Sequence, residues 1–186
     1  MNPREFVGYL KWLLEESENG RAAMVNLRRG LGKPPGSVYE TDRYVLSKLP
    51  ENASTHQEAA YYLVAALFAC WHQGKDRAES ADGNLGSSLR ALVDKENDPS
   101  KRENLEKSTE KRLNALLNAH RDDLPEHLRR IMGLLKSKDV PVNWAQLLAD
   151  AQQWGRDDRT VQHEWAKGFW VLPRKKREEE TQAETK

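Results

Sequence analysis

The chain has 186 residues, of which 32% are charged, with a net charge of +1 and a mean hydropathy of −0.87. This length allows one large domain or two small ones with a real core. The longest apolar run, Ala59–Trp71, is shorter than the about 20 residues that a membrane-spanning helix needs, so we expect no membrane contact. The N-terminal residues MNPREFVGYL lack the cleavage site of a signal peptide. One cysteine, Cys70, allows no internal disulfide, fits a reducing cytoplasm and is expected in the core.

Apolar residues recur at helical spacing through the first half of the chain. The pattern predicts helices over residues 3–17, 21–31, 40–48 and 55–72. A loop rich in glycine and proline follows the second helix. Ser54 and Gln57 form a capping box that opens the fourth helix. This helix is apolar almost all round, so we expect it at the centre of a bundle.

The second half of the chain repeats the helical pattern after a polar, glycine-containing loop at residues 73–84. Its predicted helices cover residues 85–95, 101–119, 123–136 and 143–154, with a last one that Asp157-Asp158 caps. No segment alternates with period two, so the fold class is all-α, with about nine helices in two packed helical bundles. The N-terminal bundle takes residues 1–72 and the C-terminal bundle residues 85–172. The charged tail 173–186 lacks apolar anchors and is predicted to be disordered.

Motifs for catalysis, metals or cofactors are missing. The chain has no phosphate-binding loop, dinucleotide-binding glycine motif or nucleophile elbow. The five histidines form no metal-ligand pair: His56, His72, His120, His127 and His163. A bundle enzyme would need ionisable residues that face inward, but the central helix offers only Glu58 at its start and His72 at its end. We therefore expect no catalytic residue, no metal and no cofactor.

Positive charge gathers in four places on this nearly neutral chain. Residues 20–39 hold Arg21, Arg28, Arg29 and Lys33 and no Asp or Glu. The other groups are Lys111 with Arg112, then Arg121, Arg129, Arg130, Lys136 and Lys138, and finally Arg159, His163 and Lys167 on one helix face. Each group alone fits a solvated helix face. Together they favour a surface that binds a phosphate backbone.

The tryptophans of the last two helices have two interpretations. Trp144, Trp154, Trp165 and Trp170 share helix sides with apolar residues, so we expect them in the core. The alternative is a set of platforms on which bases stack. For Trp12 and Trp71 the sequence allows either the core or a subunit interface, where tryptophan is favoured.

Several segments carry a resemblance to a known family. They are NLRRGLGKPPG at 26–36, KRLNALL at 111–117, LPEHLRR at 124–130, PVNWAQLL at 141–148 and VQHEWAKGFW at 161–170. In this order and spacing the chain, from about residue 5 to 171, resembles the CasB small-subunit family of the type I-E CRISPR Cascade complex. The family often has an arginine-rich run where this chain has Gln162-His163-Glu164. The tail after Val171 is also not part of the pattern.

The resemblance implies a non-enzymatic, all-helical subunit with two bundles and more than one copy per complex. Its partners would be the CRISPR guide RNA, the target DNA and other Cascade subunits, in the cytoplasm. It would steady the guide–target hybrid and the displaced strand. The nucleic-acid contacts that it implies are Arg28, Arg29, Lys33, Lys111, Arg112, Arg129, Arg130, Arg159 and Lys167. The turn at residues 162–164, where the family pattern is missing, is not among these implied contacts.

Two other classes of protein stay open from the sequence. A helix-turn-helix regulator would place a polar recognition helix after a short turn, as residues 143–170 superficially do. The aromatic load of the last helix argues against this class. A protein–protein adaptor without direct nucleic-acid contact is harder to exclude, because the basic faces would also suit acidic subunits.

Overall fold

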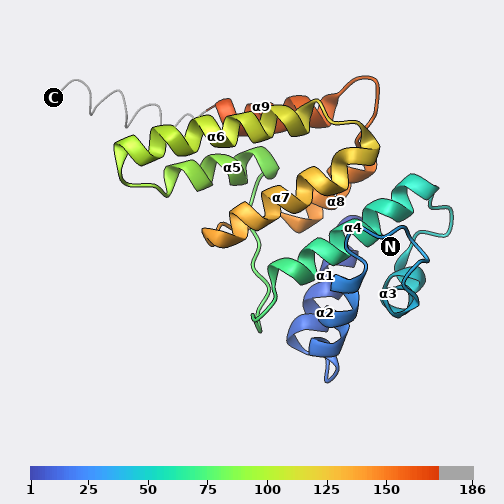
Figure 1. Cartoon of the computed structure of the whole chain (residues 1–186). Helices are drawn as coiled ribbons and strands as arrows, with labels where there is room; N and C mark the ends of the chain where they lie inside the picture. The colour runs from blue at the N-terminus through green and yellow to red at the C-terminus, as the bar shows by residue number, and fades with distance from the viewer. Residues whose placement is uncertain (172–186) are drawn as a thin grey trace.

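A computed structural model describes residues 1–171 of the chain, which form nine α-helices and two short 3₁₀ helices without a strand (Figure 1). The α-helices are α1 (Pro3–Glu15), α2 (Gly20–Arg29), α3 (Tyr39–Val45), α4 (Thr55–Trp71), α5 (Leu85–Asp94), α6 (Pro99–Leu117), α7 (Leu124–Ser137), α8 (Trp144–Gln153) and α9 (Thr160–Trp170). The 3₁₀ helices are Leu46–Lys48 and Arg121–Asp123. The prediction of an all-α fold is confirmed. The predicted tail 173–186 lies outside the described residues.

Side-chain caps fix where several helices begin. The predicted capping box of α4 is present: Gln57 N donates to Ser54 Oγ at 3.3 Å, and Ser54 N donates to Gln57 Oε1 at 3.0 Å. Asn143 accepts from the backbone of Gln146 at 3.1 Å, as its position before α8 predicts. The cap of α9 is shifted from the predicted pair, because Arg159 is the N-cap residue and Asp158 accepts from Thr160 N at 3.1 Å.

Helix α4 is the central element of the fold. Helices α2, α3, α7 and α8 all pack against it (Figure 1). Its side chains are buried on nearly every side, as an apolar helix in the middle of a bundle requires. Leu67 is 1% exposed, whereas Leu63 is only partly buried. Cys70 is also partly exposed, so the prediction that it is a core residue is wrong.

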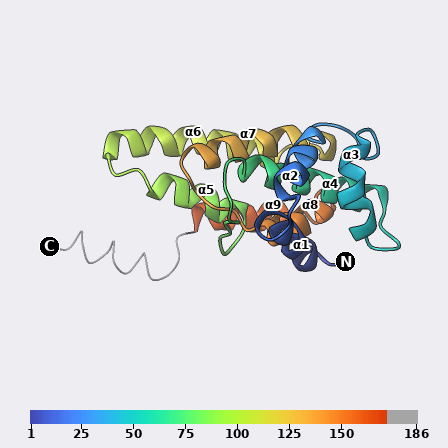
Figure 2. The ribbon, with the colours of Figure 1, turned by 90° about the horizontal axis from the view of Figure 1, so that it is seen from below.

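Helices α5 and α9 approach each other closely because two glycines lie between them. A Cβ atom at Gly86 would collide with the carbonyl oxygen of Trp165, and one at Gly168 would collide with the side chain of Asn84. Asn84 Nδ2 also donates to Glu164 O at 2.9 Å. In the turned view, α6 and α7 follow the upper edge of the molecule, while α1, α8 and α9 lie lower (Figure 2).

The segment between α4 and α5 is held down by several hydrogen bonds. Glu79 N donates to His72 Nε2 at 3.0 Å, and Trp144 Nε1 donates to Glu79 O at 3.1 Å. Ala78 N donates to Glu15 Oε1 at 2.7 Å. Helix α8 packs against both α1 and α4, so buried side chains form one cluster across the described chain. The division into bundles at 1–72 and 85–172 stays a prediction.

The tryptophans divide between core and surface. Trp144, Trp154 and Trp165 are at most 1% exposed, which confirms their prediction as core residues. The same prediction is wrong for Trp170, which is 44% exposed because it is the last residue of α9. Trp71 is buried and Trp12 is 47% exposed. None of the described helices is long and apolar enough to cross a membrane.

Candidate nucleic-acid interface

Cations from two helices meet at the C-terminal end of α4. Arg28 of α2 donates from Nη1 to Ala69 O at 3.5 Å, and Lys136 of α7 donates from Nζ to Cys70 O at 2.6 Å. Both acceptors belong to the last turn of α4, where carbonyl groups have no partner within the helix. The negative end of the helix dipole favours cations at this position. The fold therefore brings together two cations that are far apart in the sequence.

Arg129 completes a group that we call the α4 basic cluster: Arg28, Arg129 and Lys136. Arg129 lies seven residues before Lys136 on α7 and therefore shares its helix face. Burial raises the pKa of the Cys70 thiol, and the positive charges of all three cluster residues oppose that rise. Burial lowers the pKa of Lys136; the thiol of Cys70 opposes this, and repulsion by Arg28 and Lys75 adds to it. The cluster is thus a site of mutually repelling positive charge.

No carboxylate of the described chain lies within ion-pair distance of Arg28 or Lys136. Arg129 has Glu126 at 3.8 Å, and this carboxylate is shared with Arg130, which is closer at 3.0 Å. Neutral carbonyl groups orient Arg28 and Lys136 without cancelling their charge. Such a field attracts an anion, and guanidinium and ammonium groups are suited to phosphate oxygens.

The other cations of the first basic segment lie apart from the cluster. Arg29 Nη1 is 3.3 Å from Glu40 Oε1 of α3, and both side chains are largely in water. Such a surface pair is worth at most about 1 kcal/mol. Lys33 is exposed in the turn after α2. Arg28 and Arg29 are adjacent in sequence, yet they face different neighbours.

Lys111 and Arg112 are exposed on α6. Arg112 Nη1 donates to Ser108 O of the same helix at 3.1 Å, which leaves most of its guanidinium free for a ligand. Helix α6 packs against α7, and the two helices follow the same edge of the molecule (Figure 2). Nucleic-acid contact by these two residues stays a prediction.

The last predicted pair has partners of its own. Arg159 Nη2 donates to Leu117 O, the last residue of α6, at 2.7 Å. Its backbone is left-handed, with φ 49°, which is uncommon for a residue other than glycine. Lys167 Nζ is 2.8 Å from Glu164 Oε1. Arg159 therefore links the ends of two helices, and Lys167 is paired with a carboxylate on the surface.

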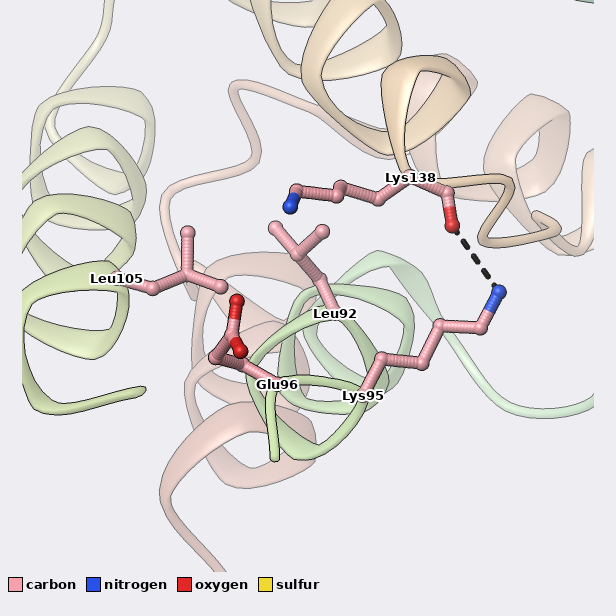
Figure 3. Close-up of a pocket in the computed structure, with 5 residues that line it drawn as sticks. All are labelled: Leu92, Lys95, Glu96, Leu105 and Lys138. Atoms are coloured by element: carbon pink, nitrogen blue, oxygen red, sulfur yellow. Dashed lines mark hydrogen bonds between the residues drawn. The ribbon is translucent and has the colours of Figure 1, made fainter. Parts of the chain in front are cut away.

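A small hollow of about 210 Å³ lies where α5, α6 and the end of α7 meet (Figure 3). Leu92 and Leu105 lie on opposite sides of it, with Glu96 at the edge. Lys95 Nζ donates to Lys138 O at 3.0 Å and to Asp139 O at 2.7 Å. These bonds fasten the end of α7 to α5, so we interpret the hollow as a packing seam.

Lys136 is a functional candidate that is absent from the binding residues predicted from the sequence. In the sequence it is one of several basic residues at 121–138, where a cation near a helix end is explained by the dipole alone. Its spacing of seven from Arg129 was the available signal. The described part of the chain holds no group of three or more side chains suited to a metal ion.

Comparison with known proteins identifies the family. Residues 23–170 match the family model of the CRISPR-associated protein Cse2. The Cse2 protein of Thermus thermophilus is 33% identical over 174 residues, which cover 91% of each chain.

Solved structures agree with this match. A crystal structure of a Cse2-family protein from T. thermophilus aligns with a TM-score of 0.76 and 29% identity, over 92% of this chain and 100% of that one. M. ruber CasB aligns with a TM-score of 0.70 and 27% identity, over 96% of each chain. A chain of a CRISPR RNA-guided surveillance complex aligns with a TM-score of 0.71 and 28% identity, over 90% of each chain. The all-α architecture and the sequence match over most of its length together place this chain in the Cse2 (CasB) family of CRISPR-associated proteins.

Proposed function

We propose that this protein is the non-catalytic small subunit of a type I-E CRISPR RNA-guided surveillance complex. It binds nucleic-acid backbone and stabilises both the guide RNA–target DNA hybrid and the displaced strand. The observation that carries the proposal is the α4 basic cluster, in which cations of α2 and α7 lie around the end of α4 without a carboxylate on Arg28 or Lys136. The similarity to a chain of a surveillance complex supports it.

The cluster suits a subunit that holds nucleic acid without reading its sequence. Base pairing with the guide supplies sequence specificity, so an accessory subunit needs affinity for the backbone and a matching shape. Phosphate contacts supply this affinity and carry no sequence information. The low net charge of +1 limits binding of the free chain to unrelated DNA.

The remaining predicted contacts lie on other surfaces, apart from the cluster. Arg29, Lys33, Lys111, Arg112, Arg130 and Lys167 are exposed cations that would contact phosphates more distant from α4. Other Cascade subunits and a further copy of the chain complete the proposed assembly in the cytoplasm. Because the subunit is proposed to lack catalysis, purified protein with Mg²⁺ or Mn²⁺ is expected to leave DNA, RNA and nucleotides intact.

The test removes the positive charge of the cluster and keeps its bulk. The variant R28Q/R129Q/K136M is assembled into the complex, and target DNA affinity is measured over a range of salt concentrations. We expect the dependence of log K on log salt to flatten by about 0.7 to 0.9 for each phosphate that the variant no longer neutralises. Unrelated target sequences, each with its own guide, are expected to be affected equally.

The matched control is R4Q/R43Q/K101Q, which removes three exposed cations from other surfaces. It should keep both affinity and salt dependence. Equal binding by the cluster variant and the wild type at every salt concentration would refute the proposal.

An adaptor without nucleic-acid contact is the second candidate, favoured by one exposed aromatic pair. Trp12 is 47% exposed and stacks on Tyr9 with ring centres 6.2 Å apart. Tryptophan and tyrosine are enriched at protein interfaces. If the cluster variant folds but does not assemble with other subunits, its cations serve protein partners and the adaptor function is favoured.

A further inference from the structure

A second hollow, which shares no residue with the α4 basic cluster, lies between the end of α6 and the turn from α8 to α9. Both turns lie at the upper right of Figure 1. The hollow has a volume of about 500 Å³ and an open mouth. It is lined by residues 117–122, residues 154–156, Arg159 and Gln162. Small-molecule sites usually have about 300 to 1,000 Å³, so one nucleotide is of suitable size.

Two arginines of this hollow are fixed by backbone carbonyl groups. Arg121 Nε donates to Trp154 O at 3.3 Å, and Arg159 Nη2 donates to Leu117 O at 2.7 Å. Gly155, with φ +89°, lets the Arg121 guanidinium lie against the turn, because a Cβ there would be 2.8 Å from Arg121 Nη2. Each guanidinium uses one nitrogen for its carbonyl group. The other nitrogens keep their N–H groups for a ligand.

The charge of the lining favours an anion. Three arginines line the hollow with one carboxylate, that of Asp122, which lies 3.3 Å from His120 Nδ1. Arg156 is already paired with Asp158, which lies outside the lining, at 2.9 Å. Arg121 and Arg159 form no ion pair within the described chain. A planar guanidinium with several free N–H groups matches the oxygens of a phosphate.

Gln162 supplies a polar group that a phosphate alone would not use. Its residue is 9% exposed, it lines the hollow, and its side chain makes no hydrogen bond in the described structure. The amide opens into the hollow, so water satisfies it until a ligand with its own hydrogen-bonding groups replaces that water. The amide has donors and an acceptor, and the edge of a nucleic-acid base presents acceptors and donors that can pair with them.

We propose that this hollow binds one unstacked nucleotide of a single-stranded nucleic acid. Arg121 and Arg159 hold its phosphate, and the Gln162 amide contacts the edge of its base. The proposal rests on the proposed function, since the strand would belong to the nucleic acid that the subunit holds. It differs from the α4 basic cluster in that it requires a base as well as a phosphate.

The test compares a short single-stranded DNA with a fully abasic strand of the same length, both fluorescently labelled. Binding to the full chain is measured by anisotropy. We expect the wild type to prefer the strand with bases by about tenfold. Q162M, which keeps the bulk and removes the amide, should lose this preference. Q153M, at an exposed glutamine of α8 outside the hollow, should keep it. R121Q should weaken binding of both strands.

Three results would overturn the proposal. The first is equal binding of both strands by the wild type. The second is a preference for the strand with bases that Q162M keeps. The third is a set of crosslinks, from a strand that contains 4-thiothymidine to the wild type, that all fall outside residues 117–122 and 154–162. The crosslink needs no variant, so the proposal stays testable if Q162M does not fold.

The cluster variant R28Q/R129Q/K136M separates this proposal from the proposed function. If that variant loses the guide–target hybrid while Q162M keeps its base preference, only the hollow fails. If the variant keeps the hybrid while Q162M loses its preference, only the cluster fails.

Discussion

The α4 basic cluster and a second charged group, the α5–α6 ion network of Arg90, Asp94, Arg102 and Glu106, hold their cations in opposite ways. In the network, Arg90 donates to Asp94 at 2.8 Å and to Glu106 at 2.6 Å, and Arg102 donates to Asp94 at 2.9 Å. In the cluster, Arg28 and Lys136 donate to backbone carbonyls. Carboxylates cancel charge, whereas carbonyl groups only orient it.

This difference separates arginines that stabilise the fold from cations that are available to a ligand. The network joins α5 to α6, and its two inner side chains, Arg90 and Asp94, are 14% and 17% exposed. The cluster leaves Arg28 and Lys136 without a carboxylate of the described chain at the end of α4. We therefore expect substitutions in the network to change stability, and substitutions in the cluster to change binding.

The largest expected effect is on the stability of the network. R90M removes the cation that both Asp94 and Glu106 contact, so their charges lose a partner in a partly buried place. We expect the free energy of unfolding to fall by about 3 kcal/mol, the lower end for breaking a buried pair, because Glu106 is partly in water. Urea denaturation measures this change. Nucleic-acid affinity of the folded fraction should stay the same, and a loss of affinity comparable to that of the cluster variant would contradict the comparison.

The next prediction concerns His72, which lies at the same end of α4 as the cluster and is neutral in the folded protein. Its Nδ1–H donates to Phe68 O at 2.9 Å, and its Nε2 accepts from Glu79 N, so the protonated ring would lose one bond. Burial, assisted by the charge of Lys75, lowers the pKa of His72 to about 4, against opposing contributions from the two backbone bonds and Glu79.

Because the folded pKa is below the unfolded value of about 6.5, the unfolded chain takes up a proton first as pH falls. The stability contributed by neutral His72 is complete above pH 6.5 and is lost between about pH 6.5 and 4. We expect a loss of about 3 kcal/mol over this range. Urea denaturation of the wild type and H72Q at pH 7, 5.5 and 4 isolates it. Equal pH dependence in both proteins would show that His72 does not control this loss.

The sequence predicted the helices well because their signals are local. The capping box of Ser54 and Gln57 and the apolar run of α4 depend on residues near one another in the chain. The charged sites depend on contacts between distant elements. Arg28 and Arg90 look alike in the sequence, but the first reaches a carbonyl 41 positions away and the second a carboxylate 16 positions away. Spacing along one helix cannot distinguish these partners.

Trp170 shows the same limit for the core. It shares a helix with Trp165, and the pattern gave both the same prediction. Trp165 is buried and donates to Asp150 Oδ2 at 2.6 Å, whereas Trp170 extends beyond the packed part of α9 and is 44% exposed. Periodicity gives the side of a helix on which a residue lies. It does not give the point at which the neighbouring elements end.

The smallest expected effect comes from two adjacent arginines that the sequence could not rank. Arg129 and Arg130 have similar exposure and share Glu126, but Arg130 is 3.0 Å from this carboxylate and Arg129 is 3.8 Å from it. Of these two arginines, only Arg129 affects the pKa of Cys70, as Arg28 and Lys136 also do.

We therefore expect R129Q to flatten the dependence of log K on log salt by about 0.7 to 0.9, the value for one phosphate contact, and R130Q to flatten it less. Each variant loses one surface charge, and its free energy of unfolding should stay within about 0.5 kcal/mol of the wild-type value. Each variant is therefore the control for the other. Titration of the assembled complex with target DNA at several salt concentrations gives both slopes. Equal slopes would mean that the position of Arg129 in the cluster has no effect on binding, and a larger change in R130Q would move the proposed phosphate contact to the outer face of α7.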